Sequence, residues 1–190
     1  MKILIINQAR MTSTRLPGKI LLPVLGKPLL AFQIERVRRS KKHNQMIIAT
    51  TTNHQDDILV NFCKRENLNY YRGSELDVLE RFYHAAKECS ADIIVRITSD
   101  CPLMDPIVLD TIIDYYLDNI NSYEYVSNTQ TRTWPRGLDA EVFSFPVLEE
   151  AFNEARLDYE REHVTPFLYL HPERYRVGQV LHDRDLSAYR

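Results

Sequence analysis

The chain has 190 residues, of which 44% are hydrophobic and 26% charged, and its formal net charge is −2. This length suffices for one domain with a proper core, and the charge supplies no basic field for nucleic acid or an anionic membrane surface. No apolar stretch approaches the length of a membrane span, and polar residues interrupt the first apolar run too early for a signal peptide. Three widely spaced cysteines fit a reducing compartment. We therefore expect a single cytoplasmic domain over residues 1–190, without nucleic-acid or membrane partners.

Strand-like and helix-like segments alternate along the chain, as is typical of a mostly parallel sheet covered by helices on both faces. Apolar runs predict strands at residues 2–7, 46–51, 69–72, 92–98, 123–127, 138–145 and 175–182. Apolar residues at helical spacing predict helices after residue 30, across 79–86 and across 109–116. Asn53 and Asp105 have the character of helix starts, and Ser74 that of the cap of the 79–86 helix. The expected fold is a three-layer α/β structure of Rossmann-like type.

The most informative segment is residues 8–19, QARMTSTRLPGK, directly after the first predicted strand. It carries three cations, Arg10, Arg15 and Lys19, together with hydroxyl side chains and a Pro-Gly turn. A loop at the carboxyl end of a first parallel strand is where open α/β sheets bind ligands, and these side chains suit a ligand with several phosphate oxygens. The segment lacks the glycine spacing of a P-loop or of a dinucleotide fingerprint, so side chains would hold the anion. A solvated basic loop is the alternative.

A second candidate is Asp100, which follows the apolar strand at 92–98. We expect its carboxylate at the same sheet edge as the first loop, where one carboxylate beside a triphosphate can hold Mg²⁺. The alternative is a turn residue or a helix cap, which fits Asp105 better because Pro106 follows it.

Three further residues carry weaker signals. Asp139 and Glu141 alternate with apolar residues, so they share one strand face and could bind sugar hydroxyls or a metal, or could face solvent. His163 could act as a general base, although a structural histidine is the simpler interpretation. The mixed segment 129–137 is either an insertion near a site or a plain connection.

Together these segments resemble the cytidylyltransferase family, which includes the enzymes that activate 3-deoxy-manno-octulosonate and N-acylneuraminate. Within it the chain is most similar to the spore coat polysaccharide biosynthesis protein F branch. The resemblance is carried by residues 8–19, 26–29, 72–74, 77–79, 96–103, 137–143 and 161–166. It implies a nucleotide-diphospho-sugar-transferase-like fold and an enzyme of surface polysaccharide biosynthesis. That enzyme would transfer CMP from CTP to a sugar and release pyrophosphate, and the arginines at 132, 136 and 161 favour an acidic sugar.

The resemblance also implies roles for single residues. The triphosphate would be held by Arg10, Ser13, Arg15 and Lys19, and Ala9 would approach the nucleotide through its backbone. The base and ribose would lie near Ser74 and Asp77. The metal would be Mg²⁺ on Asp100, and the catalytic residues would be Arg10, Lys19 and Asp100. The sugar would be faced by Asp139, Glu141, Arg161 and His163.

Relatives of this kind continue past the match to residues 185–187 into a Val-Asp-Thr stretch and a final helix. The aspartate of that stretch completes the metal site in better-known members. The sequence ends at Arg190, so we expect it to lack this segment, which bears on catalysis more than on nucleotide binding. Two alternatives stay open: a CTP-binding protein without turnover, and a glycosyltransferase that uses a nucleotide sugar. Because relatives are often homodimers, a homodimer is a further expectation.

Overall fold

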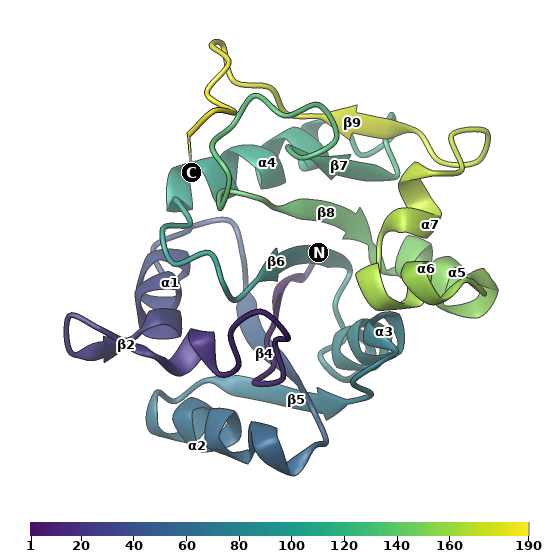
Figure 1. Cartoon of the computed structure of the whole chain (residues 1–190). Coiled ribbons are helices and arrows are strands. Elements are labelled where there is room, and N and C mark those ends of the chain that lie inside the picture. The colour runs from purple at the N-terminus through teal and green to yellow at the C-terminus, as the bar shows by residue number, and fades with distance from the viewer. Residues whose placement is uncertain (190) are drawn as a thin grey trace.

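The computed structural model describes residues 1–189, and within them all seven expected strands are present. They are β1 (Ile3–Gln8), β4 (Gln45–Thr51), β5 (Asn69–Gly73), β6 (Ile93–Thr98), β7 (Tyr125–Ser127), β8 (Glu141–Ser144) and β9 (Val177–Gln179). They form one sheet in the order β5-β4-β1-β6-β8-β7-β9 (Figure 1). Neighbouring strands are parallel except where β8 pairs with β6 and β7. A small hairpin of β2 (Pro23–Val24) and β3 (Lys27–Pro28) stands apart from this sheet.

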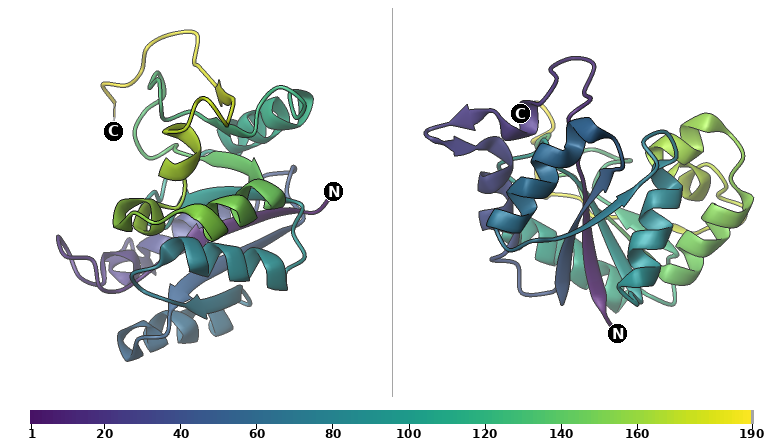
Figure 2. Two further views of the ribbon diagram at one scale, coloured as in Figure 1. Left: turned by 90° about the vertical axis from the view of Figure 1, so that its right-hand side faces the viewer. Right: turned by 90° about the horizontal axis from the view of Figure 1, so that it is seen from below.

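The central strands are apolar throughout because both faces of the sheet are covered. Ile3 and Ile5 point into one hydrophobic cluster and Leu4 and Ile6 into the other. The first cluster lies under α1 (Leu29–Val37), α2 (Asp57–Arg65) and α4 (Pro106–Asp118). The second lies under α3 (Val78–Glu88), α5 (Phe145–Glu154) and α7 (Pro166–Tyr169), with α6 (Asp158–His163) packed beside α3. Figure 2 shows the sheet between these two layers of helices, which confirms the three-layer α/β expectation.

Helices α3 and α4 each have a side chain that caps their first turn, and one of these caps corrects a prediction. Asp105 caps α4 by accepting hydrogen bonds from the backbone N–H groups of Ile107 and Val108, as expected. The prediction that Ser74 caps the 79–86 helix is wrong, because Asp77 is the cap and accepts a 2.8 Å hydrogen bond from the Glu80 N–H. Ser74 instead accepts from the Asp77 N–H and shapes the turn before the helix.

Other differences lie in the second half of the chain. Helices α5, α6 and α7 were not expected from the periodicity, and the expected strands at 138–145 and 175–182 are shorter than predicted. Across residues 1–189, no helix has the combination of length and apolar character that a membrane crossing requires.

The strand order places a topological switch point between β1 and β6. From β1 the chain runs outward to β4 and β5, and then crosses back to β6 on the other side of β1. The carboxyl ends of the two strands lie side by side, with Gln8 opposite Thr98. Ligands of open α/β sheets bind in the crevice outside such ends. The loops after β1 and β6 therefore border the expected binding position.

Candidate active site

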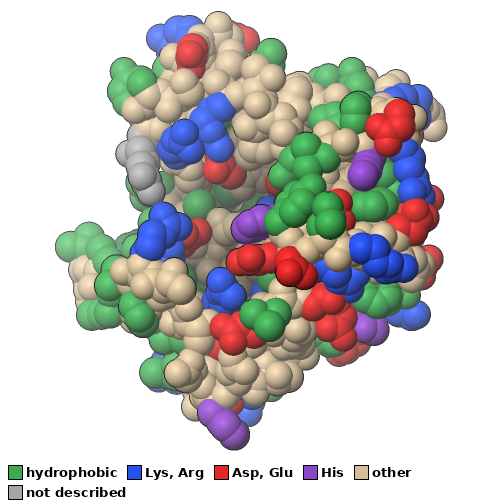
Figure 3. Space-filling view, turned by 45° about the vertical axis from the view of Figure 1, so that its right-hand side comes forward, with side chains coloured by type: hydrophobic (Ala, Val, Ile, Leu, Met, Phe, Trp, Pro, Cys, Tyr) green, Lys and Arg blue, Asp and Glu red, His purple; other side chains and the backbone are tan. Residues whose placement is uncertain are grey.

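A cavity of about 250 Å³, here cavity I, lies at this switch point. The loop after β1, the end of β6, α3 and the end of α6 all contribute to its wall. The residues predicted for the site that line it are Ala9, Arg10, Ser13, Arg15, Lys19, Asp100 and His163. In the space-filling view, basic, acidic and histidine side chains meet around a hollow in the surface (Figure 3). The fold thus brings together candidates from three separate parts of the sequence.

The loop after β1 is held in place by two carboxylates that the sequence reasoning missed. Buried Asp56 accepts a 2.7 Å hydrogen bond from the Met11 N–H, and Glu75 accepts hydrogen bonds from the Thr12 hydroxyl and the Asn53 amide. Their only sequence signal was a position close to a predicted helix start, at Asn53 for Asp56 and at Ser74 for Glu75. These bonds fix the backbone between the three cations of the loop.

The loop closes at Gly18, whose N–H donates a 2.8 Å hydrogen bond to the carbonyl of Met11. Gly18 has a φ of 71°, in the left-handed region that glycine adopts without steric cost. The 3-10 helix η1 (Lys19–Leu21) begins directly after it. This turn sets the direction in which Lys19 enters the cavity.

Lys19 and Asp100 form the closest charged contact in cavity I. The Lys19 Nζ donates to the Asp100 Oδ2 at 2.5 Å, which joins the loop after β1 to the loop after β6. Burial opposes ionisation of Asp100, but the hydrogen bond and charge of Lys19 outweigh it and lower its pKa below the ordinary value. Asp100 is therefore a carboxylate at neutral pH, with a cation already beside it.

The two arginines of the loop are less engaged. The Arg10 Nη1 lies 3.8 Å from the Glu75 Oε1, at the long end of ion-pair distances. Arg15 is exposed and makes no salt bridge within residues 1–189. Both guanidinium groups can therefore turn to a ligand. The backbone N–H of Ala9 is not free in this way, because it donates to the carbonyl of Ala49.

Asp77 and Arg161 are bound to each other. The Arg161 Nε and Nη2 contact the Asp77 Oδ2 at 2.7 and 2.6 Å, which ties the start of α3 to α6. The Arg161 Nη1 also donates to the carbonyls of Phe152 and Ala155. Both residues line a separate cavity of about 480 Å³, cavity IV, which shares Arg10 with cavity I. Their contacts give them a structural role in this state, and the role in ligand binding expected for them stays a prediction.

Asp139 and Glu141 line cavity II, of about 230 Å³, together with part of the segment 129–137. Asp139 is held by both Nη atoms of Arg132, at 2.6 and 3.1 Å. Buried Glu141 pairs with Arg96 at 2.6 Å and accepts from the hydroxyls of Tyr125 and Thr165. The segment 129–137 thus reaches a cavity rather than only connecting two strands.

Cavity III, of about 530 Å³, links these regions, because it is lined by Arg15 and Asp100 on one side and by Arg136 and Asp139 on the other. Cavities I, II and III share Thr98 at the end of β6. They therefore adjoin one another along the carboxyl edge of the sheet.

The donor groups can be tested against the expected metal. Residues 1–189 contain no cluster of three or more histidine, cysteine or carboxylate side chains arranged to hold a metal ion. Mg²⁺, however, commonly uses one or two carboxylates and completes its shell with phosphate oxygens and water. An ionised Asp100 at the wall of a cavity that also holds the three cations of the loop after β1 fits a metal that arrives with a polyphosphate.

A cavity with several cations lies at the switch point of this sheet. This arrangement is typical of α/β proteins that bind phosphorylated ligands. The particular family follows from comparison with known proteins. A sequence model of the cytidylyltransferases matches residues 3–190, and the chain belongs to the cytidylyltransferase family.

The similar proteins agree with this assignment. The chain is 44% identical to an uncharacterized protein of Methanocaldococcus jannaschii over 177 residues, which are 93% of this chain and 71% of that protein. It is 38% identical to the spore coat polysaccharide biosynthesis protein SpsF of Bacillus subtilis, over 92% of this chain and 73% of that one. A 3-deoxy-manno-octulosonate cytidylyltransferase of Chloroherpeton thalassium is 32% identical over 63% of this chain and 48% of its own length. Among solved structures, a cytidylyltransferase from Leptospira borgpetersenii superimposes with a TM-score of 0.95 at 40% identity, covering 100% of this chain and 80% of that one.

Proposed function

We propose that the protein transfers CMP from CTP to an acidic sugar and releases pyrophosphate, as a step in the synthesis of a surface polysaccharide. The single observation that carries the proposal is cavity I, where Arg10, Arg15 and Lys19 surround the switch point opposite an ionised Asp100. Family membership and the similarity to the named spore coat and 3-deoxy-manno-octulosonate proteins support it.

The reaction requires a sugar hydroxyl to attack the α-phosphorus of CTP while the bond to the β-phosphate oxygen breaks. Negative charge develops on the leaving pyrophosphate, so positioned cations supply most of the acceleration. Arg10 and Arg15 can each grip two phosphate oxygens with a planar guanidinium, and Lys19 can contact the β- or γ-phosphate as a point charge. The Ser13 hydroxyl, which also lines the cavity, can donate to a phosphate oxygen.

Mg²⁺ would be held by Asp100 and by phosphate oxygens, and would supply charge neutralisation and alignment of the displacement. For Asp100 to take this role, Lys19 must move from the carboxylate to the phosphates. The 2.5 Å ion pair between them then represents the state of the site before nucleotide binding.

The acceptor would lie in cavities II and III, next to the α-phosphate. Arg96 and Arg132 are already neutralised by Glu141 and Asp139. Arg15 and Arg136 line cavity III, and neither makes a salt bridge within residues 1–189. Because Arg15 is assigned to the triphosphate, Arg136 is the cation left to favour an acceptor with a carboxylate.

Sugar hydroxyls can be matched by other side chains of these cavities. Asp139 and Glu141 offer carboxylate oxygens, and His163 offers a ring nitrogen at the edge of cavity I. The exposed His163 side chain makes no hydrogen bond within the described part of the chain, so it is free to turn toward an acceptor. We therefore propose that these three residues face the sugar.

The test has two parts. Calorimetric titration with CTP, UTP, ATP and GTP, each with and without Mg²⁺, should show the tightest binding for CTP with Mg²⁺. Pyrophosphate release should then require CTP and an acidic sugar such as 3-deoxy-manno-octulosonate or N-acetylneuraminate, and neutral hexoses should give none. CTP binding without pyrophosphate release from any sugar would identify a binding protein, and tighter binding of a nucleotide diphosphate sugar than of CTP would identify a glycosyltransferase.

A further inference from the structure

Cavity I contains a fourth cation that no motif marks. Arg81 lies on α3 and forms part of the cavity wall, yet only 1% of the residue is exposed. Its Nη1 donates a 2.9 Å hydrogen bond to the carbonyl of Ser74, and its Nε is buried without a hydrogen-bond partner. Within residues 1–189, no carboxylate lies at salt-bridge distance from its guanidinium. Arg81 is thus a buried and unpaired charge.

Such a group costs free energy unless something compensates it, because a charge removed from water loses its hydration. Burial, and then the nearby charge of Arg10, lower the pKa of Arg81 to about 10 against the opposing charges of Asp56 and Glu75, which leaves it protonated at neutral pH. The hydrogen bond to Ser74 uses one of five N–H donors. The fold therefore retains a cation that no carboxylate contacts at salt-bridge distance within residues 1–189, and the charges of Asp56 and Glu75 offset its burial only in part.

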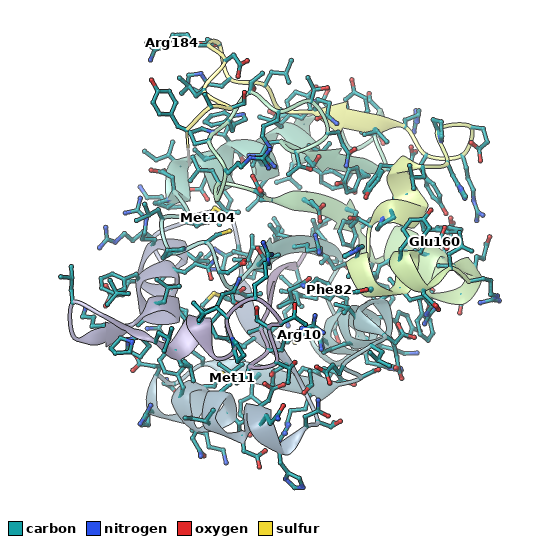
Figure 4. All side chains as sticks on the ribbon, in the orientation of Figure 1. Arg10, Met11, Phe82, Met104, Glu160 and Arg184 are labelled. Carbon is teal, nitrogen blue, oxygen red and sulfur yellow. The ribbon has the colours of Figure 1, made fainter. Side chains whose placement is uncertain are left out.

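The local structure directs this cation toward the site. Helical side chains point back toward the N-terminus of their helix, and the N-terminus of α3 borders cavity I through Val78. At the end of β5, a Cβ on Gly73 would lie 3.1 Å from the Arg81 Cγ and 3.2 Å from its Cβ, so glycine leaves room for the side chain. Arg10, labelled in Figure 4, lines the same cavity as Arg81, and its charge acts on Arg81.

We propose that Arg81 is a further nucleotide-binding residue, a buried cation behind Arg10 that attracts the phosphate tail of the nucleotide. Two like charges, Arg10 and Arg81, flank the same wall, and a polyanion relieves their repulsion while it compensates the buried one. The inference rests on the proposed CTP site and adds a residue to it. If Arg81 were purely structural, its only role would be the hydrogen bond to the carbonyl of Ser74.

The two roles separate in the variant Arg81→Met, which keeps the length of the side chain and removes its charge. Replacing a buried unpaired charge by an apolar group is commonly neutral or stabilising, so the thermal midpoint should stay the same or rise. The dissociation constant for CTP should increase about tenfold or more, as expected for the loss of a charged hydrogen-bond donor. Binding of CMP, with one phosphate, should weaken less, and binding of cytidine should not change.

Lys87→Met is the matched control, because Lys87 lies on the same helix, outside the cavities described, and its loss changes the net charge equally. Its CTP affinity should equal that of the wild type. Arg81→Lys, which keeps the charge, should bind CTP more tightly than Arg81→Met.

Three outcomes would overturn the inference about Arg81. They are unchanged CTP affinity in a folded Arg81→Met, equal weakening for CTP and cytidine, or failure of both Arg81→Met and Arg81→Gln to fold, which would make the arginine structural. If the wild-type chain binds no CTP, the proposed function itself fails, so the two failures are distinguishable.

Discussion

At the level of single residues, Lys19 and Asp100, the two charges that the proposed reaction most needs, are bound to each other. At 2.5 Å, the carboxylate competes with phosphate oxygens for the ammonium. In the proposed reaction, a triphosphate without metal would break this pair, whereas with Mg²⁺ each partner would gain a new one. The pair would therefore couple the binding of metal and nucleotide.

This coupling predicts an unusual effect of Asp100→Asn. Without Mg²⁺, the variant should bind CTP several-fold more tightly than the wild type, because Lys19 no longer has to leave a carboxylate. With Mg²⁺ the order should reverse, and pyrophosphate release should fall by at least about two orders of magnitude. Calorimetric titration with EDTA or Mg²⁺ measures the affinities, and a pyrophosphate assay measures turnover.

Loss of a negative charge near the triphosphate would by itself strengthen binding, so a control for charge is needed. Glu162→Gln removes an exposed carboxylate from the wall of the same cavity, away from Lys19. Its metal-free affinity for CTP should change less than that of Asp100→Asn. In the Lys19→Gln background, Asp100→Asn should increase the metal-free affinity for CTP no more than Glu162→Gln does. If Asp100→Asn increased this affinity equally in the wild-type and Lys19→Gln backgrounds, general charge repulsion would explain the effect instead of competition for Lys19.

At the level of elements, Asp77 connects two helices that border the site. It caps α3 and also pairs with Arg161 on α6, so one carboxylate holds the start of Arg81's helix against the helix that ends at His163. Asp77→Ala should lower the free energy of unfolding by about 2 kcal/mol, from a lost cap of about 1 kcal/mol and a lost half-buried ion pair. Denaturant unfolding measures the change.

Two variants separate these contributions. Asp77→Asn keeps a good capping residue and loses only the charge. It should therefore lower the free energy of unfolding less than Asp77→Ala does. Asp105→Ala removes the cap of α4, whose side chain has a looser contact of 3.6 Å with Arg36. If Asp105→Ala costs as much as Asp77→Ala, the connection to Arg161 contributes nothing.

How far the sequence predicts these elements depends on the kind of signal. The seven strands and the helices α1, α3 and α4 follow from apolar runs and periodicity, because these segments are long and buried on a regular face. Helices α6 and α7 have only six and four residues, too few for a periodic pattern, and α5 and α6 pack against α3. The cap of α3 was misassigned because Ser74 and Asp77 are both good capping residues three positions apart.

For the site, local sequence identifies the side chains that share a loop but not those that meet across the fold. Arg10, Ser13, Arg15 and Lys19 lie in one segment, and Asp100 could be placed nearby because parallel strands end at one edge. Asp56, Glu75 and Arg81 act through contacts between distant segments, such as the bond from the Met11 N–H to Asp56. No pattern around these residues marks such a contact.

For the whole molecule, the net charge is −2, but the charges are unevenly distributed. Several cations line cavity I at one edge of the sheet. Acidic residues from neighbouring loops hold this arrangement together, and Glu75 does so with the most partners. Thr12, Asn53 and Arg10 all contact its carboxylate. The stability of the fold and the shape of the site therefore depend on the ionisation of the same group.

This dependence predicts how Glu75 contributes to stability in acid. The hydrogen bond from Thr12, with those from Asn53 and the charge of Arg10, outweighs burial and lowers the pKa of Glu75 below its ordinary value of 4.5. The folded state thus releases this proton more readily than the unfolded state does. The stabilisation is fully present above the unfolded pKa and is lost as the pH falls through the folded pKa. The free energy of unfolding should accordingly decrease from pH 6 toward pH 3.

Glu75→Gln tests this assignment, because it keeps the size of the side chain and removes the charge. At pH 7 the variant should be less stable than the wild type by about 1 kcal/mol, and the two stability curves should converge in acid, where Glu75 is protonated as well. Urea unfolding between pH 7 and pH 3 measures both curves, and Glu162→Gln corrects for the change in net charge. A constant difference between Glu75→Gln and the wild type across this range would mean that Glu75 stabilises the loop after β1 by shape alone and not by charge.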